Sequence, residues 1–141
     1  GHGTHVSGII LSLDQNIYSS SPLVASKIQI MPLKFLNGSG TGTTSNAIRA
    51  IYYAVNNGAS VLNNSWGGSA YSSALHEAIA YTYSKGALFV AAAGNAALNN
   101  DASPMYPANY GVPNVISIAA TTDYDYLASF SNYGKTSVHL G

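Results

Sequence analysis

Two side chains of this sequence are suited to proton transfer and to the stabilisation of a negative oxygen. His2 lies in the run Gly1–Gly8 (GHGTHVSG), and a histidine with its usual pKa of about 6.5 can take up and return a proton near neutral pH. Asn95 follows the apolar run Ala87–Ala93. Its amide N–H₂ group can donate a hydrogen bond to an oxygen that becomes negative in a transition state. These two residues are therefore the first candidates for catalysis.

Each of these residues also has a simpler interpretation. Taken alone, His2 could be a surface histidine at a frayed end, and Asn95 could be a turn residue after Gly94, since both residue types tolerate positive φ. His2 and His5 are three positions apart and could share a helical face, as metal ligands do. A zinc site usually needs a third protein ligand, and no carboxylate of the sequence is placed to provide it, so a metal site is not favoured.

Two glycine-rich segments are candidates for close approach to a ligand. They are Asn37–Gly42 (NGSGTG) and Ser65–Gly68 (SWGG), and glycine lets another backbone come near. The first segment could equally be a flexible loop. It does not cradle phosphate, because no Gly-Lys-Ser/Thr sequence follows it. A nucleotide-binding α/β domain is disfavoured for the same reason.

The elements that must position these residues follow from apolar periodicity. A helix is predicted after a cap at Thr44 or Ser45, with a stop at Gly58, and another over Ser72–Ser84, ending at Gly86. Strands are predicted over Ala59–Leu62, Ala87–Ala93 and Val115–Ala120, and over 28–35 with a slip at Pro32.

The first part of the chain is less regular. The apolar run Val6–Leu11 suits a buried helix or a strand, and the segment before it favours a helix start. Asp14–Ser26 is rich in serine and is predicted to be a loop. Continuous apolar strands between helices are typical of a parallel sheet buried on both faces. We therefore predict an α/β fold with a parallel β-sheet and flanking helices, in one partial domain over residues 1–141 that is truncated at both ends.

The composition excludes several classes of partner. Only 7% of the residues are charged, against about 25% in a typical domain, and five acidic residues balance five basic ones. No basic patch is available for nucleic acid or for an anionic membrane. The sequence contains no cysteine, which rules out a disulfide framework and a thiolate metal site.

Three segments together resemble the subtilases, a family of subtilisin-like serine proteases. Gly1–Gly8 is similar to the family's catalytic-histidine motif, and Asn63–Gly68 (NNSWGG) to its substrate-binding strand. Ala91–Asn95 (AAAGN) is similar to the segment that presents the oxyanion asparagine. The resemblance extends over the whole chain and implies a subtilisin-like fold.

The resemblance implies a role for each candidate residue. His2 would take a proton from a serine and return it to the leaving amine, Asn95 would stabilise the oxyanion, and His5 would be structural. The implied substrate-binding residues are Gly38, Ser39, Gly40, Ser65, Trp66, Gly67, Ala93 and Gly94. Trp66 suits an apolar pocket wall and an ordinary core position equally well.

Other family features are expected outside or beside these motifs. The triad aspartate and serine are expected outside residues 1–141, so this chain alone is predicted to be inactive. Tyr106–Pro107 is similar to a segment with a cis proline, and Ser129–Gly134 to a structural one. No cofactor is required for the chemistry, and structural calcium is possible in the parent domain. Asp123 lies near a weak cation site of the family, while Leu23–Ser26 departs from the family pattern at another.

The function implied is a serine endopeptidase that acts on extended polypeptides, with neutral or hydrophobic residues in its main pocket. A catalytically inactive subtilase-like binding module is the alternative. The parent protein is expected to be a secreted or extracellular monomer that binds neither nucleic acid nor membrane.

Overall fold

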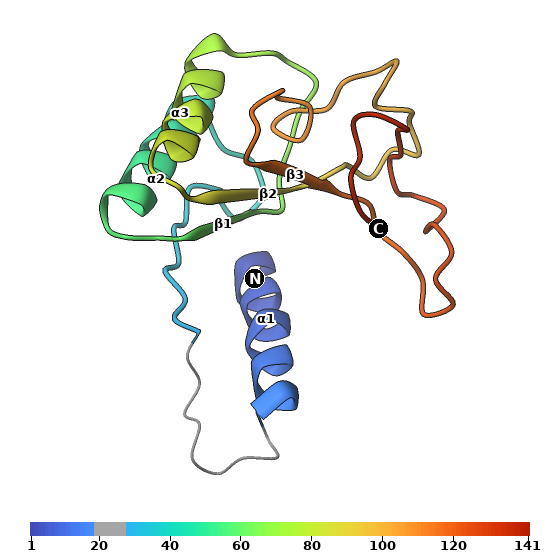
Figure 1. Cartoon of the computed structure of the whole chain (residues 1–141), viewed down its shortest axis with the longest axis horizontal. Coiled ribbons are helices and arrows are strands. Elements are labelled where there is room, and N and C mark those ends of the chain that lie inside the picture. Colours follow the sequence, from blue (N-terminus) through green and yellow to red (C-terminus); the bar gives the residue numbers. More distant parts are fainter. Residues whose placement is uncertain (19–27) are drawn as a thin grey trace. The chain divides into compact units, whose positions relative to one another are not determined.

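A computed structural model describes residues 1–18 and 28–141 of the chain, with no description of the side chains of residues 13–18. Within this range the chain forms two compact units, Gly1–Thr43 and Thr44–Gly141 (Figure 1). His2 and the segment Asn37–Gly42 belong to the first unit, and Asn95 belongs to the second.

The first unit begins with helix α1, His2–Tyr18. The helical alternative for Val6–Leu11 is confirmed, but the run is not buried, since Ile9 is 50% exposed. The predicted loop from Asp14 is wrong as far as Tyr18, because no proline interrupts the helix before Pro22. The remainder of that predicted loop, including Leu23–Ser26, lies outside the described residues.

The strand predicted over 28–35 is not formed. These residues belong to no helix or strand, and Ile28 and Met31 are 40% and 38% exposed. An apolar alternation becomes a strand only where a neighbouring strand supplies a ladder of hydrogen bonds. The three strands of the described chain pair with one another and not with this segment, and Pro32 has no N–H group to offer a ladder.

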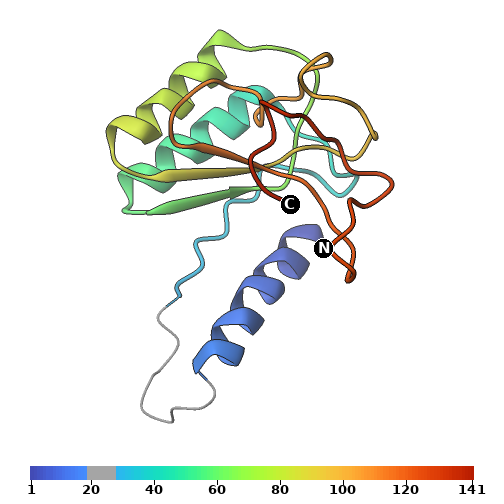
Figure 2. The ribbon, with the colours of Figure 1, turned by 45° about the vertical axis from the view of Figure 1, so that its right-hand side comes forward.

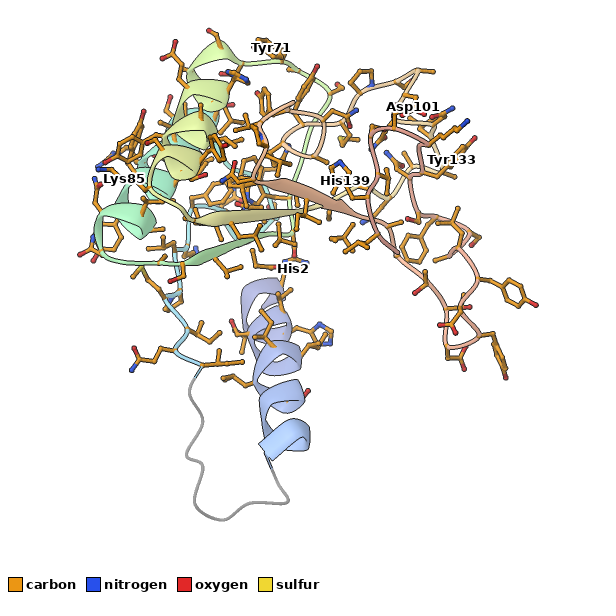
Figure 3. The ribbon with its side chains drawn as sticks, viewed as in Figure 1. His2, Tyr71, Lys85, Asp101, Tyr133 and His139 are labelled. Carbon is orange, nitrogen blue, oxygen red and sulfur yellow. The ribbon has the colours of Figure 1, made fainter. Side chains whose placement is uncertain are left out.

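The second unit has the parallel sheet that the sequence predicts. Its elements are α2 (Thr44–Asn56), β1 (Val61–Asn64), α3 (Ser73–Ser84), β2 (Leu88–Ala92) and β3 (Val115–Ile118). The strand order is β1-β2-β3, and both pairs are parallel. The segment after β3 returns to the edge of that strand through a parallel bridge between Ile118 and Leu140, and His139 Nδ1 accepts a hydrogen bond from Ser117 N at 2.9 Å (Figure 3).

Local sequence signals account for the start of α3 and for the carboxyl ends of both helices. The cap predicted at Thr44 or Ser45 is wrong, because both residues already lie within α2. Ser72 caps α3, since its Oγ accepts a hydrogen bond from Leu75 N at 3.3 Å. Gly58 follows α2 with φ of 85° and Gly86 follows α3 with φ of 72°, a conformation that glycine adopts at little cost. The two predicted helices and their glycine stops are confirmed.

Helices α2 and α3 lie side by side on the same face of the sheet (Figures 1 and 2). The core between the two layers contains Ala47, Ile51, Leu75, Ile79, Phe89 and Ala91, each at most 4% exposed. The alternate residues of β2 and β3 are only half-buried. Within this unit both helices cover one face of the sheet, and burial of the second face stays a prediction.

Strand β1 begins and ends two residues later than predicted. The apolar run stops at Leu62, yet the ladder with β2 continues through Asn63 and Asn64. Asn64 is buried, and its Nδ2 donates to Leu62 O at 3.0 Å and to Val90 O at 3.3 Å. A polar residue extends the strand here because its amide group is satisfied by backbone oxygens.

No helix in residues 1–18 and 28–141 is long and apolar enough to cross a membrane.

Candidate active site

The candidate site of the second unit lies at the carboxyl edge of the sheet. Parallel strands end at the same edge, and in open α/β sheets that edge is where ligands bind. Strand β1 leads there into Ser65–Gly68, and β2 leads into Ala93, Gly94 and Asn95. The fold therefore brings two of the predicted site segments to the same edge.

Asn95 itself is exposed, in the bend that follows β2. Within the described part of the chain, its side-chain amide makes no hydrogen bond to another residue. Its N–H₂ group is therefore open to a ligand, as a donor to an oxyanion must be before the substrate binds.

The buried side chain of Asn132 fixes the loop that carries Asn95. The Oδ1 atom of Asn132 accepts hydrogen bonds from Ala96 N at 2.8 Å and from Leu98 N at 3.2 Å. The backbone N–H of Asn132 donates to Gly94 O at 2.9 Å, and Asn132 is fully buried. A buried side chain with these partners holds the loop in one conformation on both sides of Asn95.

A second buried asparagine completes the support. Asn132 Nδ2 donates to Asn100 Oδ1 at 2.9 Å, and Asn100 Nδ2 donates to Ala93 O at 2.8 Å. The network therefore runs from the end of β2, through two fully buried amides, back to the loop that follows β2. Both amide groups of the pair are used, so neither carries the cost of an unsatisfied buried polar group.

Ser65–Gly68 is held by Tyr106 and by the end of β1. Gly68 N donates to Tyr106 O, and Tyr106 N donates to Gly68 O, both at 2.8 Å. A Cβ on Gly67 would lie 2.9 Å from Tyr106 O, so this close approach requires glycine. Trp66 is half-buried and its Nε1 donates to Asn64 Oδ1 at 3.1 Å. The Tyr106–Pro107 peptide is cis, as the resemblance implied.

A group of four aromatic side chains includes Tyr106, the residue that pairs with Gly68. Tyr71, His76, Tyr106 and Tyr110 lie with neighbouring ring centroids 4.6–6.4 Å apart. Tyr71 is exposed (Figure 3). Burial raises the pKa of the Tyr110 hydroxyl, which donates to Ser72 O at 3.0 Å and accepts from Ser72 N at 3.1 Å. This contact ties the start of α3 to the segment that contains the cis proline.

Asp101 organises the turn that follows Asn132. Its carboxylate accepts hydrogen bonds from the backbone N–H groups of Lys135, Thr136 and Ser137, at 2.8–3.4 Å, and from Thr136 Oγ1 at 2.8 Å (Figure 3). The side chains of Ser137 and Thr136, followed by these backbone donors, lower the pKa of Asp101 from 3.8 to about 2. The Ser137 hydroxyl forms no hydrogen bond of good geometry, so we assign the lowering chiefly to Thr136 and the backbone donors.

The remaining predicted residues lie in the first unit. His2 is exposed and is the first residue of α1. Gly38, Ser39 and Gly40 are exposed in a tight turn, in which Gly40 has φ of 75°. The turn is closed by Asn37, whose backbone N–H donates to Thr41 O at 2.8 Å. The roles of these residues, and those of Asn95 and Ser65–Gly68, stay predictions.

Sequence reasoning missed the residues that fix the loop. Asn132 lies in Ser129–Gly134, the segment that the resemblance marks as structural. That resemblance is the only sequence feature that points to Asn132. Nothing in the sequence pairs Asn132 with Asn100 or assigns Asp101 to the following turn, because these partners are more than 30 positions apart.

The fold and the arrangement of its loops define a class of protein. This is an α/β protein whose parallel strands bring the glycine-rich segment Ser65–Gly68 and the exposed Asn95 to one edge of the sheet. The family model described as "Subtilase family" (Peptidase S8) matches residues 1–140, and the chain belongs to this family.

Individual relatives agree with this assignment. Subtilisin-like protease 2 of Plasmodium falciparum is 39% identical over 144 residues, which cover 99% of this chain and 11% of the relative. Thermitase of Thermoactinomyces vulgaris is 40% identical over 135 residues, which cover 96% of this chain and 46% of the relative. A solved cold-adapted subtilisin-like serine proteinase has a TM-score of 0.67 and 36% identity, over 76% of this chain and 38% of its own. The chain thus spans less than half the length of these relatives.

Proposed function

We propose that the full-length protein is a serine endopeptidase of the subtilisin type, and that residues 1–141 supply its general base and one donor of its oxyanion hole. The observation that carries the proposal is the exposed Asn95 amide at the carboxyl end of β2, on a loop fixed by the buried Asn132. Membership of the subtilase family supports it.

In this proposal the reaction is acyl transfer to a serine. His2 takes the proton of the serine hydroxyl as that oxygen attacks the peptide carbonyl, and returns it to the leaving amine. Asn95 donates a hydrogen bond to the carbonyl oxygen as it becomes negative. A fixed donor contributes most to rate, since it does not have to reorganise when the charge develops. The serine and the aspartate that orients His2 would come from other parts of the full-length protein.

Extended peptides are the proposed substrates. By the resemblance, Gly38, Ser39 and Gly40 would each lie against the peptide backbone, and so would Ser65, Trp66 and Gly67. Gly94 would border the main pocket. Ala93 is only 1% exposed, so it would position Gly94 rather than contact the peptide. Trp66 is half-buried beside Asn64, and no acidic residue lies in these segments. The main pocket would therefore prefer neutral or hydrophobic residues. Secretion, a monomeric state and structural calcium in the parent domain remain part of this proposal.

Labelling by a serine-reactive inhibitor tests the proposal. The full-length protein should react covalently and lose all peptidase activity, while its His2→Ala variant should react far more slowly, because no base would activate the serine. His5→Ala is the matched control. Because His5 has only a structural role in this proposal, the variant should label at the rate of the unmodified protein once its folding has been verified. A full-length protein that is folded but does not react would instead favour the inactive binding module.

A further inference from the structure

The chain contains two Asn-Gly pairs in exposed positions, Asn37–Gly38 and Asn57–Gly58. Glycine after asparagine leaves the next backbone nitrogen open to approach by the asparagine side chain, because no Cβ shields it. Exposure and sequence are the same for both pairs. What differs is the direction in which each asparagine side chain is held.

The amide oxygen of Asn37 is surrounded by three donors. Its Oδ1 accepts from Ser39 N at 2.9 Å, from Thr41 N at 3.1 Å and from Thr41 Oγ1 at 3.0 Å. These donors come from residues after Asn37, so the side-chain amide is held forwards along the chain, on the side of Gly38. In the described part of the chain, Gly38 N makes no hydrogen bond that would compete.

We propose that Asn37 is a site of spontaneous deamidation, at which its own turn accelerates the reaction. The Gly38 nitrogen loses its proton to water and attacks Cγ of Asn37, forming a new C–N bond, while the electron pair of the C=O bond moves to Oδ1. The three donors stabilise that negative oxygen as an oxyanion hole does. The amide nitrogen of the intermediate takes up a proton from water and leaves as ammonia while the C=O bond re-forms, and water then opens the resulting succinimide ring to aspartate or isoaspartate.

Asn57 has the opposite arrangement. Its Nδ2 donates backwards to Tyr53 O at 2.8 Å, which directs the side chain towards the preceding turn of α2. Gly58 N, the nitrogen that would attack, donates to Val55 O at 3.1 Å. Attack at Asn57 therefore has to break two hydrogen bonds, and no donor to its Oδ1 is found among the described residues. We expect Asn57 to deamidate slowly.

The product changes the electrostatics of the turn. One new carboxylate takes the formal net charge of these 141 residues from 0 to −1. An aspartate at position 37 could keep the same three donors, whereas isoaspartate lengthens the backbone by one carbon and cannot keep the same turn. Deamidation at Asn37 does not require that this turn bind peptide.

Peptide mapping by mass spectrometry on the full-length protein tests the proposal. The protein is aged at mildly alkaline pH with a serine-reactive inhibitor present to prevent self-cleavage. We expect deamidation at Asn37 to be at least about tenfold faster than at Asn57, which corresponds to a difference of about 1.4 kcal/mol in activation free energy. Thr41→Val should slow the reaction at Asn37 by about tenfold, as expected for losing one donor to a charged oxygen, and leave Asn57 unchanged.

Thr41→Ser keeps the hydroxyl and should deamidate at the original rate, which separates the donor from a general loosening of the turn. Equal rates at Asn37 and Asn57 would overturn the proposal. Faster reaction in Thr41→Val would also overturn it, because it would show that the hydrogen bonds protect Asn37. An unchanged deamidation rate at Asn37 in Thr41→Val would overturn the proposal that the turn accelerates the reaction.

Discussion

The side chain of Asn132 fills the space that a Cβ atom would occupy if Gly94 were replaced by another residue. A Cβ on Gly94 would lie 2.6 Å from Asn132 Nδ2, and Gly94 has φ of 122°. The two residues are 38 positions apart, and a hydrogen bond of 2.9 Å joins Asn132 N to Gly94 O. The position of Asn95 therefore depends on one glycine and one buried amide.

Replacement of Gly94 by alanine should destabilise the fold and displace Asn95. The backbone conformation alone costs about 1–3 kcal/mol for a residue with a side chain, and the contact with Asn132 adds to this. The measurement is the free energy of unfolding of the full-length protein. Gly111→Ala is the control, since a Cβ there would meet nothing within 4 Å. Equal losses in both variants would contradict the account.

Replacement of Asn132 by alanine should lower both stability and kcat. Ala96 N, Leu98 N and Asn100 Oδ1 would lose their partner, at a cost of about 2 kcal/mol or more. KM should change less than kcat, because substrate contacts remain while Asn95 becomes mobile. Asn132→Asp keeps the acceptor for both loop N–H groups but sets a buried carboxylate oxygen against Asn100 Oδ1, so it should also lose stability. If Asn132→Ala unfolds at the original denaturant concentration with full kcat, the loop is fixed by other contacts.

The contribution of Asp101 to stability, through the turn at Lys135–Ser137, should decrease at low pH. Asp101 has its pKa lowered from 3.8 to about 2, so its contribution is fully present above pH 3.8 and is lost as the pH falls through 2. The difference in unfolding free energy between the original protein and its Asp101→Asn variant should therefore shrink between pH 5 and pH 2. Because Asp101 is exposed, we expect a small effect. A difference that stays constant over this range would show that the carboxylate charge is irrelevant.

The start of α3 should depend on Ser72. Its Oγ accepts from Leu75 N, and loss of such a cap costs about 1 kcal/mol. Ser72→Ala should lower the unfolding free energy by this amount, and Ser72→Asp should restore it. Ser73→Ala, at the first helical position, should be nearly neutral. Equal losses for Ser72→Ala and Ser73→Ala would argue against the cap.

Sequence periodicity predicted the elements whose signals are local. The ends of α2 and α3 were predictable because Ser72, Gly58 and Gly86 act within one helical turn of where they stand. The apolar runs that became β2 and β3 were predictable for the same reason. In contrast, the strand expected over 28–35 depended on a neighbouring strand, which local sequence does not provide.

The candidate site was predicted only in part. Motif resemblance made His2, Asn95 and Ser65–Gly68 candidates, since each lies in a short contiguous segment, and their roles stay predictions. It did not find the pair Asn100 and Asn132, because an asparagine in a sequence is most simply a turn residue. Their partners become evident only when the chain has folded.

The most direct test of the proposed function is the steady-state kinetics of Asn95→Ala in the full-length protein. In subtilisin, the established example of this effect, losing one oxyanion donor lowers kcat by about 10²–10³. We expect a loss of that size for Asn95→Ala with KM nearly unchanged, since Asn95 would act in the transition state and not in ground-state binding. A variant that keeps its original kcat would contradict the oxyanion role on which the account depends.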